Sequence, residues 1–287
     1  MTMNRKILIS GALGQLSRKF QRILSEEERD FIALDKKDWN ITDFKRTKEV
    51  INIVKPDVVI NCASYNLVDE AEEKPDLAYS VNSEAVRNLA DICKKKNIFL
   101  VHYSSDYVFD GQKQDLYIEE DKTNPLNVYG KSKLKGEQAI REIISDYLIF
   151  RLSWVIGKGK QNFLYKVWNW AQKSKVLKIS ADEVSVPTFT EDIVKITLLS
   201  LEKGIKGLFH LTNSGYASRY ELAKYFLSQI GTDNIIIPVS RTYFKTKAER
   251  PMFSAMSNSN ISKILNVSIP TWQESMVKFI RNFQGEC

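Results

Sequence analysis

The chain has 287 residues, 43% of them hydrophobic and 27% charged, which is enough for one large domain or two modest ones with ample core. No apolar run approaches the roughly 20 residues of a membrane span, and no secretory pattern opens the sequence, so we expect a cytoplasmic protein without membrane partners. The net charge of +7 suggests an anionic partner. Because the lysines are scattered and no arginine-rich run occurs, a small phosphorylated ligand is expected and nucleic acid is not.

The cysteines predict neither a disulfide framework nor a metal site. Cys62, Cys93 and Cys287 have no metal-ligand spacing, and the chain contains only two histidines. We therefore expect reduced thiols and assign no metal ligands, and the sequence leaves any metal requirement open.

A strand, a glycine turn and a helix open the chain. Lys6–Ser10 is a short apolar run, Gly11 and Gly14 follow it, and an amphipathic stretch comes next. Glycines at such a turn let the backbone approach a pyrophosphate at the N-terminus of a helix. The spacing is Gly-x-x-Gly-x-x-Ser, with Ser17 where the usual pattern has a third glycine. The turn predicts a dinucleotide site.

The next strand bears on the choice of cofactor. Phe31–Asp35 ends in an acid about 20 residues after the glycine turn, where dinucleotide folds place a carboxylate on the adenosine ribose. Asp35 favours NADH by this rule, whereas the following Lys36 and Lys37 could hold the 2′-phosphate of NADPH. The expected cofactor is NADPH or NADH.

Strands and helices alternate through residue 155, which predicts an α/β fold with a doubly wound parallel Rossmann sheet. Polar residues follow several of these strands, and the carboxyl edge of such a sheet is where ligands bind. The further strands are expected at Val58–Ala63, Ile98–Tyr103, Leu148–Leu152 and Gly207–Thr212, and the polar residues are Ser64, Tyr65, Asn66, Ser104, Ser105, Asp106, Tyr107, Ser153 and Trp154.

Tyr129 and Lys133 lie four residues apart where a helical pattern begins, so they should share one helix face. A free phenol has a pKa of about 10, and a nearby ammonium group stabilises its ionised form. The pair predicts acid–base chemistry, although a Tyr-x-x-x-Lys pattern by itself also fits a half-exposed helix face.

The pattern changes after residue 159, and a smaller substrate-binding domain is expected there. We assign residues 1–153 and 191–213 to the dinucleotide-binding domain, and residues 154–190 and 214–287 to the substrate domain. Thr190 is a plausible N-cap of the helix at 191–201. The other elements expected are helices at Phe163–Gln172, Tyr220–Ile230 and Trp272–Phe283 and a strand at Val176–Ser180.

Six motifs follow one another along the chain. They are Gly11-x-x-Gly14-Gln-Leu, Ser105-Asp-Tyr-Val-Phe-Asp-Gly111, Asn127-Val-Tyr-Gly-Lys-Ser-Lys133 with Gly136-Glu137, Arg151-Leu-Ser-Trp154, Pro187-Thr-Phe-Thr190 and Arg250-Pro251. Together they resemble the dTDP-4-dehydrorhamnose reductase family, a group of extended short-chain dehydrogenases/reductases. The resemblance runs from about residue 6 to 280.

The resemblance implies reduction of the C4 ketone of a nucleotide-linked 4-dehydro-6-deoxy sugar, most simply dTDP-4-dehydro-L-rhamnose, by NAD(P)H. It implies a nucleotide-sugar substrate. The oligomeric state stays open, and a homodimer is one possibility. Carried over, the cofactor contacts are Gly14, Gln15, Leu16, Asp35, Asn40, Ile41, Ser64, Tyr65, Asn66, Tyr129 and Lys133, and the sugar contacts are Ser105, Asp106, Tyr129 and Trp154.

Three residues depart from the family pattern. Ser17 replaces a glycine, Asn40 stands where an acid is frequent, and Ser185 stands where glycine commonly precedes Pro-Thr. The first two bear on cofactor affinity and the third on the substrate loop, so the sugar is less well defined than the chemistry.

The mechanistic hypothesis gives Tyr129 the role of proton donor to the developing alkoxide, with Ser105 as a hydrogen-bond donor to the carbonyl. Lys133 binds the nicotinamide ribose and lowers the pKa of Tyr129. Arg250 beside Pro251 could clamp the diphosphate of the ligand or form a surface ion pair. Ser105 could instead cap a turn, Asp106 could hold a loop, and Trp154 could belong to the core.

Other activities stay open at this point. A sugar-nucleotide dehydratase would carry Asp-Glu after its Ser or Thr, whereas Tyr107 follows Asp106 here. An epimerase would consume no NAD(P)H. Residues 104–111 also resemble the regulatory subunit of methionine adenosyltransferase, a cofactor-binding partner protein without catalysis, against which Trp154 and the aromatic helix after it favour the reductase.

Overall fold

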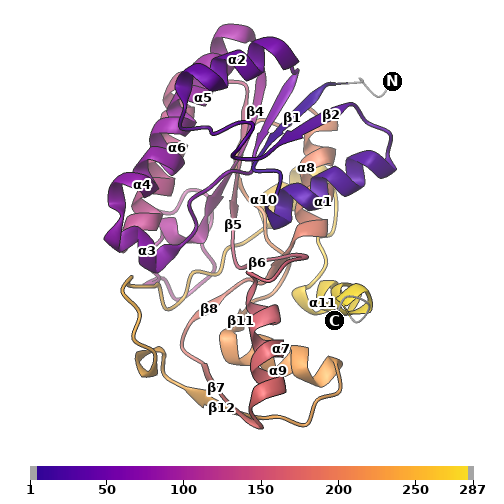
Figure 1. Cartoon of the computed structure of the whole chain (residues 1–287). Coiled ribbons are helices and arrows are strands. Elements are labelled where there is room, and N and C mark those ends of the chain that lie inside the picture. The colour runs from indigo at the N-terminus through magenta and orange to yellow at the C-terminus, as the bar shows by residue number, and fades with distance from the viewer. Residues whose placement is uncertain (1–4, 284–287) are drawn as a thin grey trace.

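A six-stranded parallel sheet forms the larger part of the computed structural model, which describes residues 5–283 (Figure 1). Its short apolar strands are covered on both faces, as expected for parallel strands. The doubly wound Rossmann fold predicted from the sequence is confirmed. The strand order is β10 (Gly207–His210), β5 (Tyr147–Leu152), β4 (Phe99–Ser105), β3 (Val58–Asn61), β1 (Ile7–Ser10) and β2 (Phe31–Leu34).

Alternation along the strands creates two cores. Ile7 and Ile9 of β1 pack in a cluster with Phe20 and Leu24, whereas Leu8 between them packs on the opposite face. The first face is covered by α1 (Gln15–Glu26), α8 (Thr190–Glu202) and α10 (Ser259–Leu265). The other face is covered by α2 (Phe44–Val54), α5 (Ala85–Lys96) and α6 (Val128–Ile143).

The connection between β3 and α5 is helical and irregular. It contains α3 (Val68–Glu73), α4 (Pro75–Tyr79) and a π-helical turn (Ser80–Glu84). One 3₁₀ turn (Asp106–Val108) follows β4. Another (Arg241–Tyr243) lies before α10 in the chain.

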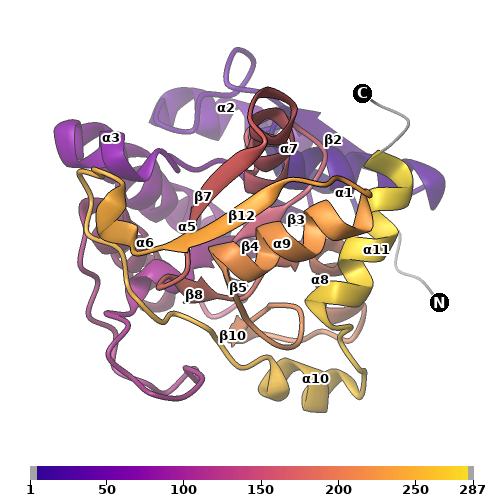
Figure 2. The ribbon, with the colours of Figure 1, turned by 90° about the horizontal axis from the view of Figure 1, so that it is seen from below.

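A smaller unit packs below the carboxyl edge of the sheet (Figures 1 and 2). Its core holds Leu164, Phe226, Trp272 and Met276. It contains three two-stranded pairs and three helices: β6 (Val155–Ile156) with β9 (Thr188–Phe189), β7 (Val176–Ser180) with β12 (Ile235–Val239), β8 (Val184–Ser185) with β11 (Ala217–Ser218), α7 (Phe163–Lys173), α9 (Arg219–Gln229) and α11 (Trp272–Phe283).

Two details differ from the sequence-based expectations. Thr190 is not the N-cap of α8, because β9 pairs with β6 up to Phe189 and Thr190 is already the first helical residue. Ile261, Leu265 and Ile269 pack in the core of the sheet, although they lie in the segment 214–287 that we assigned to the substrate domain. The chain therefore returns to the sheet late in the sequence, which no local pattern signals.

Two further expectations concern membrane segments and cysteines. No helix within residues 5–283 is both long enough and apolar enough to cross a bilayer. Cys62 and Cys93 are unpaired, and Cys287 lies outside the described residues.

Candidate active site

The start of α6 brings Tyr129 and Lys133 to the carboxyl edge of the sheet. Asn127 caps the helix, since its Oδ1 accepts a hydrogen bond from the Gly130 amide at 2.8 Å. A Cβ atom at Gly130 would lie 2.2 Å from the Tyr107 carbonyl oxygen, so only glycine allows this close packing. The cap and the glycine together place Tyr129 beside the turn that follows β4.

The Tyr129 phenol is held in its protonated form. Burial raises the pKa of Tyr129 to about 12, and a hydrogen bond with Ser105 acts in the opposite direction. The Tyr107 ring meets the Tyr129 ring edge-on, with centroids 5.8 Å apart. Lys133 is not among the causes of the pKa shift in this structure, in contrast to the role expected from the sequence.

Lys133 is a buried ammonium group with a neutral partner. Its side chain is 2% exposed, and Nζ donates a hydrogen bond to the Tyr103 carbonyl oxygen at 2.6 Å. Burial lowers the pKa of Lys133 to about 8, and the nearby Glu137 carboxylate opposes this shift. Lys133 is thus still mostly charged at neutral pH.

Ser105 ends β4 and makes several local contacts at once. Its Oγ accepts a hydrogen bond from the Tyr107 amide at 3.2 Å and donates one to Asp106 Oδ1 at 3.0 Å. The capping role considered from the sequence is therefore real. Ser105 also forms a hydrogen bond with the phenol of Tyr129, so the capping contact does not remove Ser105 from the site.

Asp106 is a buried carboxylate surrounded by serine hydroxyls. Ser254, Ser185 and Ser153 donate to its Oδ2 at 2.6, 2.9 and 3.3 Å. Burial raises the pKa of Asp106, and these hydrogen bonds partly oppose the shift. Ser185, which departs from the family pattern, is thus part of the site, and the serines tie β4 to the smaller unit.

The glycine turn has the geometry that a pyrophosphate requires. Gly11 has φ = 69°, and a Cβ atom there would lie 3.1 Å from the Ala63 amide nitrogen. Gly14 is exposed directly before α1, whose first turn has no side-chain cap, and the amide groups of a first helical turn have no partner within the helix. Ser17 is fully buried, so a serine fits where the third glycine is usual.

The loop after β3 is fixed by a residue that the sequence did not reveal. Asn82, which is 1% exposed, accepts hydrogen bonds from Ser64 Oγ at 3.1 Å and from the Tyr65 amide at 2.9 Å. Its Nδ2 donates to Ser132 at 3.0 Å and thereby joins this loop to α6. The π-helical turn that places Asn82 has no simple sequence signature.

The residues after β2 lie at the same carboxyl edge, since Ser10 of β1 is in register with Leu34 of β2. Asp35 accepts hydrogen bonds from the amides of Lys37 at 2.7 Å and Asp38 at 3.3 Å, and Lys36 and Lys37 are exposed. Asn40 Oδ1 accepts from Thr42, and Ile41 is buried in the core.

Trp154 and Arg219 form the opposite wall. The Arg219 guanidinium lies 3.7 Å from the centroid of the Trp154 ring. Trp154 is half-buried and has φ = 36°, a strained backbone for a bulky residue and one that is typical of functional sites. A capping box between Ser218 and Glu221 fixes the start of α9 and hence Arg219, which the sequence reasoning missed.

Arg250 is engaged elsewhere. Its Nη1 and Nη2 donate to Asp69 at 3.1 and 2.6 Å, and it does not line the cavity described next. The ion-pair alternative for Arg250 thus describes its contacts in this structure.

One cavity of about 330 Å³ brings most of the predicted residues together, and we call it the sheet-edge cavity. Gly11, Asp35, Asn40, Ile41, Tyr65 and Arg250 are outside its lining. The predicted residues that line it are Gly14, Gln15, Leu16, Ser64, Asn66, Ser105, Asp106, Tyr129, Lys133 and Trp154.

These features define a Rossmann-type nucleotide-binding protein with a tyrosine–lysine pair at the carboxyl edge of its sheet. The chain belongs to the RmlD substrate binding domain family, whose model matches residues 5–284. This membership confirms the resemblance found in the motifs.

Three similar proteins illustrate the range of the family. The spore coat polysaccharide biosynthesis protein SpsK of Bacillus subtilis is 32% identical over 98% of this chain and 99% of its own length. A dTDP-4-keto-6-deoxy-D-glucose reductase of Streptomyces niveus is 33% identical over 80% of this chain and 81% of its own length. The crystal structure of a dTDP-4-dehydrorhamnose reductase of Bacillus anthracis in complex with NADP has a TM-score of 0.94 at 32% identity, covering 98% and 100% of the chains.

Proposed function

We propose that this protein uses NADPH to reduce the C4 ketone of dTDP-4-dehydro-L-rhamnose to the alcohol of dTDP-L-rhamnose. The observation that carries the proposal is the meeting of Tyr129, Lys133 and Ser105 in one cavity bordered by the glycine turn. Relatives at 30–33% identity that carry reductase names support the reaction class.

The residues of the sheet-edge cavity fit a dinucleotide. Gly14 and the free amides of α1 suit a pyrophosphate, and the buried Ser104 Oγ at the cavity wall has no hydrogen-bond partner among the described residues. NADPH is favoured over NADH because Lys36 and Lys37 are exposed next to Asp35 and could hold the 2′-phosphate. The NADP complex of the Bacillus anthracis relative supports the same choice. When bound, NADPH supplies the hydride.

Tyr129 would donate the proton that completes the alcohol. Because the pKa of Tyr129 is raised to about 12, the phenol holds its proton at neutral pH and can transfer it to the C4 oxygen. The phenolate left behind gains stability from the Ser105 hydroxyl. We propose that Lys133 holds the cofactor ribose with the ammonium hydrogens that Tyr103 does not use.

Ser105 would polarise the ketone. Its hydroxyl hydrogen points to Asp106 in this structure, so the ketone oxygen must compete with that carboxylate for the same donor. The serines around Asp106 already satisfy its other oxygen, which lowers the cost of releasing Ser105.

The nucleotide part of the substrate would lie along Trp154 and Arg219. The guanidinium of Arg219 lines the sheet-edge cavity and can bind a diphosphate, with Trp154 as a flat wall beside it. We propose Arg219, rather than Arg250, as the main diphosphate contact, because Arg250 already makes two hydrogen bonds to Asp69.

A second candidate substrate is dTDP-4-keto-6-deoxy-D-glucose, on which the Streptomyces niveus relative is named to act. The test presents both ketosugars to the purified protein with NADPH or NADH and follows absorbance at the nicotinamide band. We expect NADPH to be consumed with dTDP-4-dehydro-L-rhamnose at a kcat/KM at least tenfold above that with dTDP-4-keto-6-deoxy-D-glucose. The reverse ratio would select the second candidate. If neither ketosugar caused oxidation of NADPH or NADH, the proposed function would be overturned.

We also propose the cytoplasm as the compartment. Two unpaired thiols, Cys62 and Cys93, suit a reducing environment. Fractionation of cells that produce the tagged protein should place it with soluble cytoplasmic markers, and recovery with the membrane or outside the cell would reject this assignment.

A further inference from the structure

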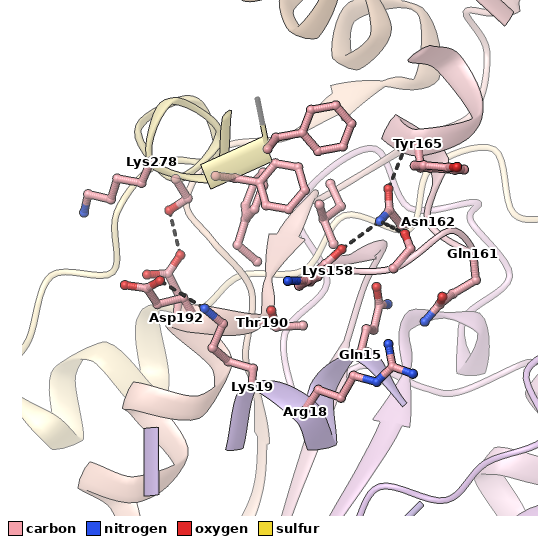
Figure 3. Close-up of a pocket in the computed structure, with 18 of the residues that line it drawn as sticks. Gln15, Arg18, Lys19, Lys158, Gln161, Asn162, Tyr165, Thr190, Asp192 and Lys278 are labelled. Carbon is pink, nitrogen blue, oxygen red and sulfur yellow. Dashed lines mark hydrogen bonds and ion pairs between the residues drawn. The ribbon is translucent and has the colours of Figure 1, made fainter. Parts of the chain in front are cut away.

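A second and larger cavity lies on the other side of the glycine-turn helix, and we call it the α1–α11 cavity. Its volume is about 580 Å³, within the usual range of small-molecule sites. It is enclosed by α1, the loop after β6, the start of α8 and the C-terminal part of α11 (Figure 3). None of the residues that we place in catalysis lines it.

One side of this cavity is aromatic. Phe279 of α11 packs against Phe189 with ring centroids 5.6 Å apart and against Phe283 at the same distance. Ile156 adds a buried aliphatic side chain beside them. Phe279 and Phe283 are half-buried, and covering their remaining apolar surface with a flat, weakly hydrated group would be favourable.

The rim of the cavity is cationic. Arg18 from α1 and Lys158 and Lys160 from the loop after β6 converge on it, while Lys19 is paired with Glu191. Within residues 5–283, the exposed side chains of Arg18 and Lys160 make no hydrogen bond or ion pair, so their charges are available to a ligand. Six lysines and arginines line the cavity against two carboxylates, those of Glu191 and Asp192, and an anion would offset this excess of positive charge.

The cavity is separate from the sheet-edge cavity but adjacent to it. Gln15 and Gln161 line both cavities and form part of the wall between them. Gln15 Nε2 donates to the Val155 carbonyl oxygen at 2.9 Å, whereas Gln15 Oε1 is buried without a partner among the described residues. A buried acceptor of this kind is normally satisfied, and because Gln15 lines both cavities, a ligand in either of them can supply the donor.

We propose that the α1–α11 cavity binds a nucleoside polyphosphate, with its base against the Phe279 wall and its phosphates at Arg18, Lys158 and Lys160. A fatty acid would use one cation and would need a long apolar channel. An inorganic phosphate chain would leave the phenyl wall uncovered. Only a ligand with a planar ring and several negative charges uses both halves of the cavity.

The test uses the full-length protein loaded with one equivalent of NADPH, so that the cofactor turn is filled. Isothermal titration calorimetry with ATP should show one additional site per chain. The Arg18→Glu/Lys160→Glu variant should weaken ATP binding about tenfold for each cation reversed. The matched control, Lys45→Glu/Lys48→Glu, reverses two exposed charges on α2 (Figure 1) and should bind ATP as the wild type does.

Three further measurements complete the test. Ketosugar reduction should keep its kcat and KM in the Arg18→Glu/Lys160→Glu variant, which shows that the fold and the sheet-edge cavity are intact. Tripolyphosphate and adenosine should each bind at least tenfold more weakly than ATP. The protein should not change its oligomeric state in sedimentation velocity when Arg18 and Lys160 are reversed.

Several results would overturn the proposal. They are the absence of ATP binding to the wild type, equal ATP binding by the two double variants, or tripolyphosphate binding as tight as that of ATP. A dimer that dissociates in the Arg18→Glu/Lys160→Glu variant without any ATP site would assign this face to a second copy of the chain.

Discussion

Two buried cations lie close to the Glu137 carboxylate, and they are held in opposite ways. Arg151 donates to Glu137 through Nε at 3.0 Å and Nη2 at 2.8 Å, and both side chains are almost inaccessible. Lys133, one helical turn before Glu137, makes its hydrogen bond to the neutral Tyr103 carbonyl.

The difference separates a structural charge from a functional one. The ion pair of Arg151 satisfies both partners, so neither is free to act on a ligand. The ammonium group of Lys133 has three donors and gives one to Tyr103, so the others can meet a ligand at the cavity wall. Burying an ammonium group without a directly bonded carboxylate destabilises its charged form, and burial accordingly lowers the pKa of Lys133 to about 8.

The largest effect is expected where the reacting proton is removed. Tyr129→Phe should lower kcat by about 10² to 10⁴-fold, because general-acid assistance is typically of this size, and should leave the thermal midpoint nearly unchanged. Steady-state assays and calorimetry measure both. Tyr147→Phe, which removes a hydroxyl at the opposite end of the sheet, is the control. Wild-type turnover in Tyr129→Phe would remove Tyr129 from the mechanism.

The structural cation should matter for stability. Arg151→Met leaves Glu137 buried and unpaired, so the free energy of unfolding should fall by about 3–5 kcal/mol. The double variant Arg151→Met/Glu137→Met should recover most of this loss, since it removes both charges. Urea unfolding followed by circular dichroism measures the difference. A loss below about 1 kcal/mol in the single variant would mean that Glu137 finds another partner.

The functional cation should make stability depend on pH. Burial lowers the pKa of Lys133 from 10.5 to about 8, so the folded protein binds fewer protons than the unfolded chain between these values. The penalty is complete below about pH 8 and disappears as the pH rises toward 10.5. Relative to Lys133→Met, the wild type should therefore gain roughly 3 kcal/mol over this interval. Parallel denaturation curves measure this gain, and a difference independent of pH would show that the ammonium group is not desolvated.

A smaller effect is expected on cofactor binding. Lys133→Met should weaken NADPH binding about 10- to 100-fold, because hydrogen bonds from charged groups contribute about 1.5–3 kcal/mol. Lys131→Met, which changes an exposed lysine on the same helix, should bind NADPH normally. Fluorescence titration of NADPH compares the two variants. Equal affinities would place the ribose away from Lys133.

The local part of the site could be predicted from the sequence. Tyr129 and Lys133 share one face of α6 and both line the sheet-edge cavity, because a spacing of four residues is fixed by helical geometry alone. The glycine turn and the polar residues at the strand ends were equally predictable, since every parallel strand of a doubly wound sheet ends at the same edge.

Contacts between distant segments could not be predicted in this way. Asp106 accepts hydrogen bonds from serines at positions 153, 185 and 254. Arg250 forms an ion pair with Asp69, which lies 181 residues earlier in the sequence. The sequence predicts Thr190 as an N-cap because Thr before Glu-Asp is a common helix start. In the structure β9 pairs with β6 up to Phe189, and Thr190 is the first residue of α8.

The sequence by itself determined the order of strands and helices, the glycine turn and the tyrosine–lysine pair, because each depends on residues within a few turns or one strand of each other. Only the tertiary structure decided that Lys133 has a carbonyl as its partner while Arg151 has a carboxylate, that Arg219 lies on Trp154, and that a second cavity opens between α1 and α11. These features depend on how side chains from remote segments pack and lose water together, and no periodicity along the chain encodes that.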